Sequence, residues 1–165
     1  MDASFRLGAP HAQDIAVVVA YVKSRAAVPV WLVGTSQGTL SATNVGVRLD
    51  RQIDGVVLTS SISRPGGRQS YHGAVAPQGV LTLGLESLSV PVLVVAHAND
   101  ACGVTPSDDA PRILDRLVQS PRKAVRVLAG GDPPQSGPCD ALSAHGYLGI
   151  EPEAVRTIAE FILGP

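Results

Sequence analysis

The feature that most constrains this chain is a buried-type strand that runs directly into a Gly-x-Ser-x-Gly turn. Four apolar residues, Val30 to Val33, precede the turn, and a small-residue segment with helical character follows at Leu40 to Leu49. A strand that turns abruptly into a helix leaves its corner residue exposed and its backbone strained. We predict that Ser36 is this corner residue. Side chains at Gly34 and Gly38 are expected to collide across the turn. A plain glycine-rich connection is the alternative, because the chain contains 17 glycines.

Other segments alternate between strand and helix patterns. Apolar runs predict strands at 53–59, 90–96 and 124–128. Helical spacing predicts helices at 10–27, from 105 and from 151. The inner face of the first helix is expected at Ile15, Val18, Val19 and Val22. The inner faces of the second and third are expected at Ile113, Leu114, Leu117 and Val118 and at Val155, Ile158, Ala159 and Ile162. Strands without polar alternation, separated by helices, indicate an α/β fold with a mostly parallel sheet and helices on both faces, in three layers. We expect one domain over residues 1–165.

Composition excludes several classes of function. The chain is 16% charged with a net charge of −1, so it offers no basic patch for nucleic acid. No apolar run is long enough to span a membrane, and the N-terminus lacks the basic-then-apolar order of a signal peptide. The two cysteines do not form a zinc motif, and no glycine-rich loop is built to hold a nucleotide phosphate. We expect neither a metal nor a cofactor.

A serine hydroxyl becomes a strong nucleophile only when a general base takes its proton and an anionic group orients that base. In parallel sheets such residues gather on loops beyond the carboxyl ends of strands. Asp100 follows the strand at 90–96 and is the predicted acid. Asp108 and Asp109 are alternatives, although both resemble acidic residues in the first turn of a helix.

His145 is the predicted base. It follows the last strand and precedes the last helix, whereas His11, His72 and His97 lie at a helix start, in a long loop and just before Asp100. We expect activity to rise with pH as the imidazole loses its proton and becomes able to accept one.

In three segments the chain resembles the α/β-hydrolase superfamily, specifically its small esterase-like members. The segments are Gly34-Thr35-Ser36-Gln37-Gly38, His97-Ala98-Asn99-Asp100-Ala101-Cys102 and Ala144-His145-Gly146-Tyr147. The resemblance covers only the C-terminal two-thirds of the usual fold. We therefore expect a truncated or minimal version of that fold. It implies that Ser36 is the nucleophile, Asp100 the acid and His145 the base in hydrolysis of carboxylic esters through an acyl-enzyme. The small residues of 60–80 border an open site and suit short, uncharged esters. Amide hydrolysis, thioester hydrolysis and acyl transfer stay open.

The resemblance also implies two oxyanion donors. The backbone N–H of Gln37 is one. The loop that usually carries the second is missing, so the N-terminus at 4–10 or the side chain of Gln37, Thr35 or Ser60 is expected to replace it. The alternatives are a non-catalytic binding or assembly module, or a fragment of a longer hydrolase.

Two further expectations follow from these assignments. If Asp100 and His145 meet, their loops lie side by side, so Cys102 and Cys139 can form a disulfide. Such a bond suits an oxidising compartment, which conflicts with the missing signal peptide and leaves the compartment open. In the resemblance, Val30 to Val33 also lacks a neighbouring strand on one side. An open apolar edge invites pairing, so we expect a homo-oligomer, most simply a dimer.

Overall fold

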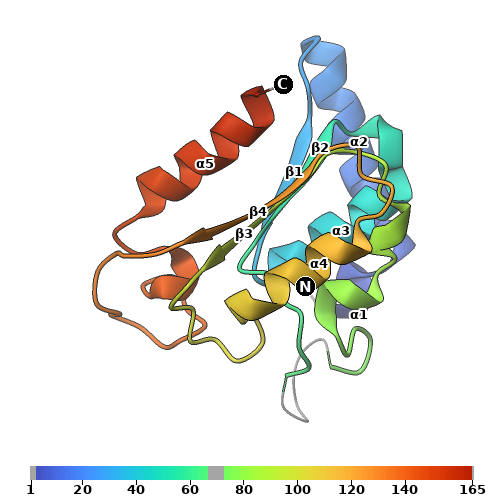
Figure 1. Ribbon diagram of the computed structural model, residues 1–165. Coiled ribbons are helices and arrows are strands. Elements are labelled where there is room, and N and C mark those ends of the chain that lie inside the picture. The colour runs from blue at the N-terminus through green and yellow to red at the C-terminus, as the bar shows by residue number, and fades with distance from the viewer. Residues whose placement is uncertain (1–2, 67–72, 165) are drawn as a thin grey trace.

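A computed structural model describes residues 3–66 and 73–164 of the chain (Figure 1). Within the loop predicted at 60–80, residues 67–72, which include His72, lie outside the described residues. The described residues form one parallel sheet with the order β1-β2-β3-β4. Its strands are β1 (Trp31–Thr35), β2 (Gly55–Thr59), β3 (Val92–His97) and β4 (Lys123–Leu128). The four predicted strands are confirmed, with small shifts at their ends.

Five α-helices accompany the sheet in the described chain. They are α1 (Ala3–Arg6), α2 (Ala9–Arg25), α3 (Gln37–Leu49), α4 (Ala110–Arg116) and α5 (Glu151–Leu163). Figure 1 shows α5 on one face of the sheet and α2, α3 and α4 on the other. The predicted three-layer architecture is therefore confirmed.

The central strands explain why the sequence lacks polar alternation. Successive side chains of a strand point to opposite faces. Val56 and Leu58 of β2 join the core beneath α3 and α4, whereas Val57 joins the core beneath α5. Every residue of β2 and β3 is buried. Because all strands are parallel, their carboxyl ends meet at one edge of the sheet, which is where the predicted site residues lie.

Four predicted helix-face residues point outward instead. Val18 is 54% exposed, Val22 is 37% exposed, Val118 is 68% exposed and Val155 is 64% exposed. Helix α2 buries His11, Ala12 and Val19 instead of Val18, and α5 buries Ala154 instead of Val155. Helix α4 ends at Arg116, so Val118 lies beyond the helix. Helical spacing predicted that these helices exist, but it placed the start of α4 at 105 instead of Ala110 and misassigned these inward-facing residues.

Candidate active site

Ser36 occupies a strained corner between β1 and α3. It is the N-cap residue of α3, with φ 53° and ψ −118°, a backbone conformation that residues other than glycine rarely adopt. A Cβ atom added to Gly34 would lie 2.3 Å from the carbonyl oxygen of Gly38, so Gly34 is sterically required. A Cβ atom at Gly38 would meet nothing within 4 Å. The prediction of a tight corner is confirmed for Gly34 and is wrong for Gly38, which lies on the open side of the turn.

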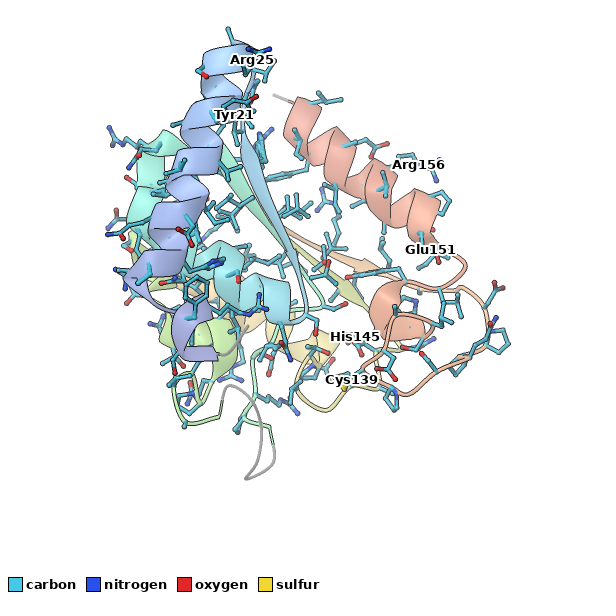
Figure 2. All side chains as sticks on the ribbon, turned by 180° about the vertical axis from the view of Figure 1, so that it is seen from behind. Tyr21, Arg25, Cys139, His145, Glu151 and Arg156 are labelled. Carbon is cyan, nitrogen blue, oxygen red and sulfur yellow. A yellow bond between two sulfur atoms is a disulfide. The ribbon has the colours of Figure 1, made fainter. Side chains whose placement is uncertain are left out.

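Asp100 and His145 meet although 45 residues separate them. His145 Nδ1 lies 3.0 Å from Asp100 Oδ2, and the two side chains are only 4% and 1% exposed. Asp100 follows β3, and His145 lies in a 3₁₀ turn, Ala144–Gly146, after β4. Figure 2 shows His145 just beyond the end of α5 that carries Glu151. A carboxylate at Nδ1 favours the tautomer in which Nδ1 carries the proton and Nε2 accepts one.

Thr105 completes this pair. Its buried hydroxyl donates to Asp100 Oδ2 at 2.8 Å, and its oxygen lies 3.2 Å from His145 Nδ1. The backbone N–H of Cys102 donates to the other carboxylate oxygen, Asp100 Oδ1, at 2.9 Å. The sequence suggested only that Thr105 opens a helix, and the spacing from Asp100 carried no signal for this contact.

A second set of contacts fixes the backbone around His145. Ser60, which has φ 44°, donates its hydroxyl to the carbonyl of His145 at 2.8 Å. The Tyr147 hydroxyl accepts the Ser60 N–H at 3.2 Å and donates to the Val95 carbonyl at 3.0 Å. Burial raises the pKa of Tyr147 above its usual value, more than the hydrogen bonds from Ser60 lower it. The phenol therefore keeps the proton that it donates to β3.

The predicted disulfide between Cys102 and Cys139 is present. It joins the loop of Asp100 to the loop of His145 across a sequence separation of 37 residues. Figure 2 shows Cys139 close to His145. The same two loops are therefore joined by a hydrogen bond and by a covalent bond.

The structure does not join Ser36 to His145. No hydrogen bond links Ser36 Oγ to His145 Nε2 among the described residues, and Nε2 is buried without a partner. Gln37, the predicted oxyanion donor, begins α3, where the first N–H groups of a helix lack intrahelical acceptors. Of the hydroxyls considered as a second donor, Ser60 donates to the carbonyl of His145 and Thr35 pairs with Thr59 at 2.6 Å.

The alternative acids lie elsewhere. Asp108 is exposed, whereas Asp109 is buried and accepts hydrogen bonds from Ser63, Arg64 and Arg112. Burial alone would raise the pKa of Asp109, but these hydrogen bonds outweigh it and hold the pKa below its usual range. Asp109 is therefore a charged residue that links the loop at 63–64 to α4, a role that the sequence alone did not reveal.

One cluster of possible metal ligands occurs in the part of the chain that the structure describes. Asp100, Cys102 and His145 place ligand atoms within 4.8 Å of one another. The sulfur of Cys102 is in a disulfide, so it offers no thiolate, and the other two groups bind each other. The cluster is better suited to proton transfer than to holding a metal. Over the described residues, no helix has the length and hydropathy to cross a membrane.

Comparison with known proteins bears on the fold. No protein family and no curated protein matches the chain in sequence. The chain is similar in structure to a zinc-bound, cold-adapted esterase from an Arctic intertidal metagenomic library, with TM-score 0.52 and 17% identity, over 74% of this chain and 49% of that one. It thus spans about half the length of that esterase.

Two similar structures match almost the whole chain. One is a thermophilic esterase from Thermogutta terrifontis, with TM-score 0.61 and 15% identity, over 92% of this chain and 70% of that one. The other is BpoC from Mycobacterium tuberculosis H37Rv, with TM-score 0.59 and 17% identity, over 92% of this chain and 72% of that one. These similarities are similarities of fold, and they agree with the parallel sheet covered by helices on both faces. The chain thus has a truncated α/β-hydrolase fold.

Proposed function

We propose that the chain is a serine hydrolase that cleaves carboxylic esters, with Ser36 as nucleophile, His145 as general base and Asp100 as the group that orients the base. The observation that carries this proposal is the buried hydrogen bond between Asp100 and His145, at the sheet edge where Ser36 occupies its strained corner. Two of the similar structures are described as esterases, which supports this reaction class.

The proposed reaction begins when the side chain of Ser36 turns so that Oγ donates to His145 Nε2, the buried nitrogen that has no partner in the described structure. Oγ attacks the ester carbonyl while Nε2 takes the hydroxyl proton, and Asp100 stabilises the imidazolium that forms. The carbonyl oxygen becomes an oxyanion that accepts the N–H of Gln37. The C–O bond to the alcohol then breaks, and Nε2 returns the proton to the alcohol. Water deacylates the enzyme by the same proton transfers.

Substrates in this proposal are short-chain and uncharged. The described parts of 60–80 that border the site contain mainly small and apolar residues, with Arg64 bonded to Asp109. The second oxyanion donor has no assigned residue. Loss of one donor costs about 10²–10³ in turnover. We therefore expect modest rates unless another N–H reaches the oxyanion.

Turnover of p-nitrophenyl acetate and butyrate tests the proposal. We expect Ser36→Ala to lose all measurable turnover, whereas Ser24→Ala, an exposed serine on α2, should match the wild type. Equal rates for the wild type and Ser36→Ala would remove the esterase proposal.

A second candidate is a non-catalytic binding or assembly module, or a piece of a longer hydrolase. The missing contact between Ser36 and His145, and the match to half of the Arctic esterase, favour this candidate. Tight binding of an ester without turnover would support it.

Three further expectations belong to the same proposal. Residues 1–165 work as one domain. The Cys102–Cys139 disulfide persists in an oxidising compartment. The working form is a homo-oligomer in which a second copy covers Val30 to Val33.

A further inference from the structure

Strand β1 has an open edge. It stands at the end of the strand order, and its pairing with β2 is the only ladder it forms among the described residues. Ser36 donates its N–H across this ladder to Thr59 at 3.0 Å. Backbone groups of a strand alternate in direction from one residue to the next. The N–H and C=O groups of Trp31, Val33 and Thr35 therefore point away from β2.

The two edges of the sheet differ in charge. Edge strands of natural proteins are commonly protected from pairing by charged side chains. Strand β4 carries exposed Lys123 and Arg126, whereas β1 (Trp31–Thr35) has no ionisable side chain. Val33 and Val127, at the middle of β1 and near the end of β4, are almost equally exposed, at 54% and 53%. The edge at β1 thus lacks the charges that the edge at β4 has.

Apolar surface lies on both faces of this edge. A cavity of about 290 Å³ lies on the α2 and α3 side of β1 and another of about 190 Å³ on the α5 side, and Val33 lines both. Figure 2 views the molecule from this side, with β1 between α2 and α5. Val17, Val18 and Tyr21 of α2 are 54% to 70% exposed, and Val155 of α5 is 64% exposed.

We infer that β1 pairs antiparallel with β1 of a second copy of this chain, about a two-fold axis at Val33. The outward-pointing residues are symmetric about Val33. In this register the two Val33 residues exchange both backbone hydrogen bonds, and Trp31 of each copy pairs with Thr35 of the other. The four strands of each copy then form one continuous sheet.

The absence of charged side chains on β1 favours a second copy of this chain as its partner. Like charges directly opposite each other destabilise a strand pair, and two copies of β1 bring none together. Two copies of β4 would place two lysines and two arginines along one strand pair. An acidic or basic peptide would find no opposite charge on β1 itself.

The helices enlarge the interface. A five-residue strand pair is marginal by itself in water. A two-fold axis perpendicular to the sheet keeps each layer on its own side, so α2 meets α2 of the second copy. The exposed Val17, Val18 and Tyr21 then lose contact with water. Stable dimers bury about 800 Å² per partner, which requires helices as well as strands.

The test is the mass of the full chain in solution, measured by sedimentation velocity. Protein concentrations of about 10–100 µM are used, a range in which a dimer with a micromolar Kd forms. We expect the wild type at twice 17.0 kDa, Val33→Lys at 17.0 kDa and the matched edge variant Val127→Lys still at twice 17.0 kDa. Circular dichroism shows whether each variant is folded. A wild type at 17.0 kDa, a dimeric Val33→Lys, or dissociation by Val127→Lys instead would overturn the inference.

Hydrogen exchange on the wild type provides a readout that needs no variant. The N–H groups of Val33 and Thr35 face outward in the single copy, so the dimer should protect them, and dilution should remove that protection. Fast exchange of both at every concentration would contradict pairing at β1, even if the chain were dimeric through another surface.

Discussion

The two halves of the candidate site are built differently. The half that carries His145 is buried and held by hydrogen bonds with Asp100, Thr105 and Ser60, and by a disulfide. The half that carries Ser36 depends on a strained backbone turn at the end of an edge strand, and Ser36 Oγ forms no hydrogen bond within the described part of the chain.

In the proposed mechanism, this difference separates two tasks. Setting the tautomer of a base requires fixed partners in a site that excludes water, and the half with His145 has both. Presenting a nucleophile requires a free hydroxyl, and the strained corner supplies one without side-chain support. Changes around His145 should therefore alter proton transfer, whereas changes around Ser36 should alter the fold of the turn.

After loss of the nucleophile itself, the largest effect is expected from Asp100→Asn. An amide at this position no longer favours the tautomer with a proton on Nδ1, so kcat should fall by about 10³- to 10⁴-fold while KM changes little. Asp108→Asn is the matched control, because Asp108 is exposed and outside the site, and its kcat should stay within about twofold. Equal losses in the two variants would contradict the assignment of Asp100.

Removal of the disulfide should have the next largest effect. The bond closes a loop with a sequence separation of 37 residues, so Cys102→Ser with Cys139→Ser should lower the free energy of unfolding by about 3–4 kcal/mol, measured in urea. Reductant should lower the stability of the wild type and leave that of the double variant unchanged. Peptide masses that do not change on reduction of the wild type would show that the bond is not formed.

Substitutions in the turn test the other half. Gly34→Ala should destabilise the chain by about 2 kcal/mol or more, because the new methyl group would overlap the carbonyl of Gly38. Gly38→Ala is the matched control, with open space around its Cβ position and better helix propensity in α3, so its stability should stay the same or rise slightly. Thermal melts of the two variants measure this difference, and equal destabilisation would show that the turn is packed differently.

The smallest effect is expected from Thr105→Val, which removes one hydrogen bond to Asp100. Net hydrogen-bond contributions of about 1 kcal/mol correspond to a kcat about fivefold lower, with KM unchanged. Thr105→Ser keeps the hydroxyl and should restore most of the rate. A valine variant with wild-type kcat would show that Thr105 has only a packing function.

Much of this architecture was predictable because it follows from local rules. Apolar runs such as Val92–His97 become buried parallel strands, and glycine at position 34 marks a turn where a Cβ atom has no room. Asp100 and His145 could be paired because both follow predicted parallel strands, whose loops gather at one edge of the sheet, and because their order resembles that of α/β-hydrolases.

The parts that were not predictable depend on contacts between distant residues. Thr105 and Ser60 look like ordinary loop residues, and only the packed loops bring them to Asp100 and His145. The burial of Asp109 depends on Ser63 and Arg64 from another loop. Which helix residues face inward, such as Ala154 instead of Val155, depends on how each helix is placed on the sheet.

Covalent trapping is the most direct test of Ser36 as an activated nucleophile. The wild type, Ser36→Ala and Ser24→Ala are treated with a fluorophosphonate, which reacts with activated serine hydroxyls, and their intact and peptide masses are measured. We expect one adduct per chain on the wild type and on Ser24→Ala, located in the peptide that contains Ser36, and none on Ser36→Ala. An unmodified wild type, or an adduct on a different serine, would show that Ser36 is not the nucleophile.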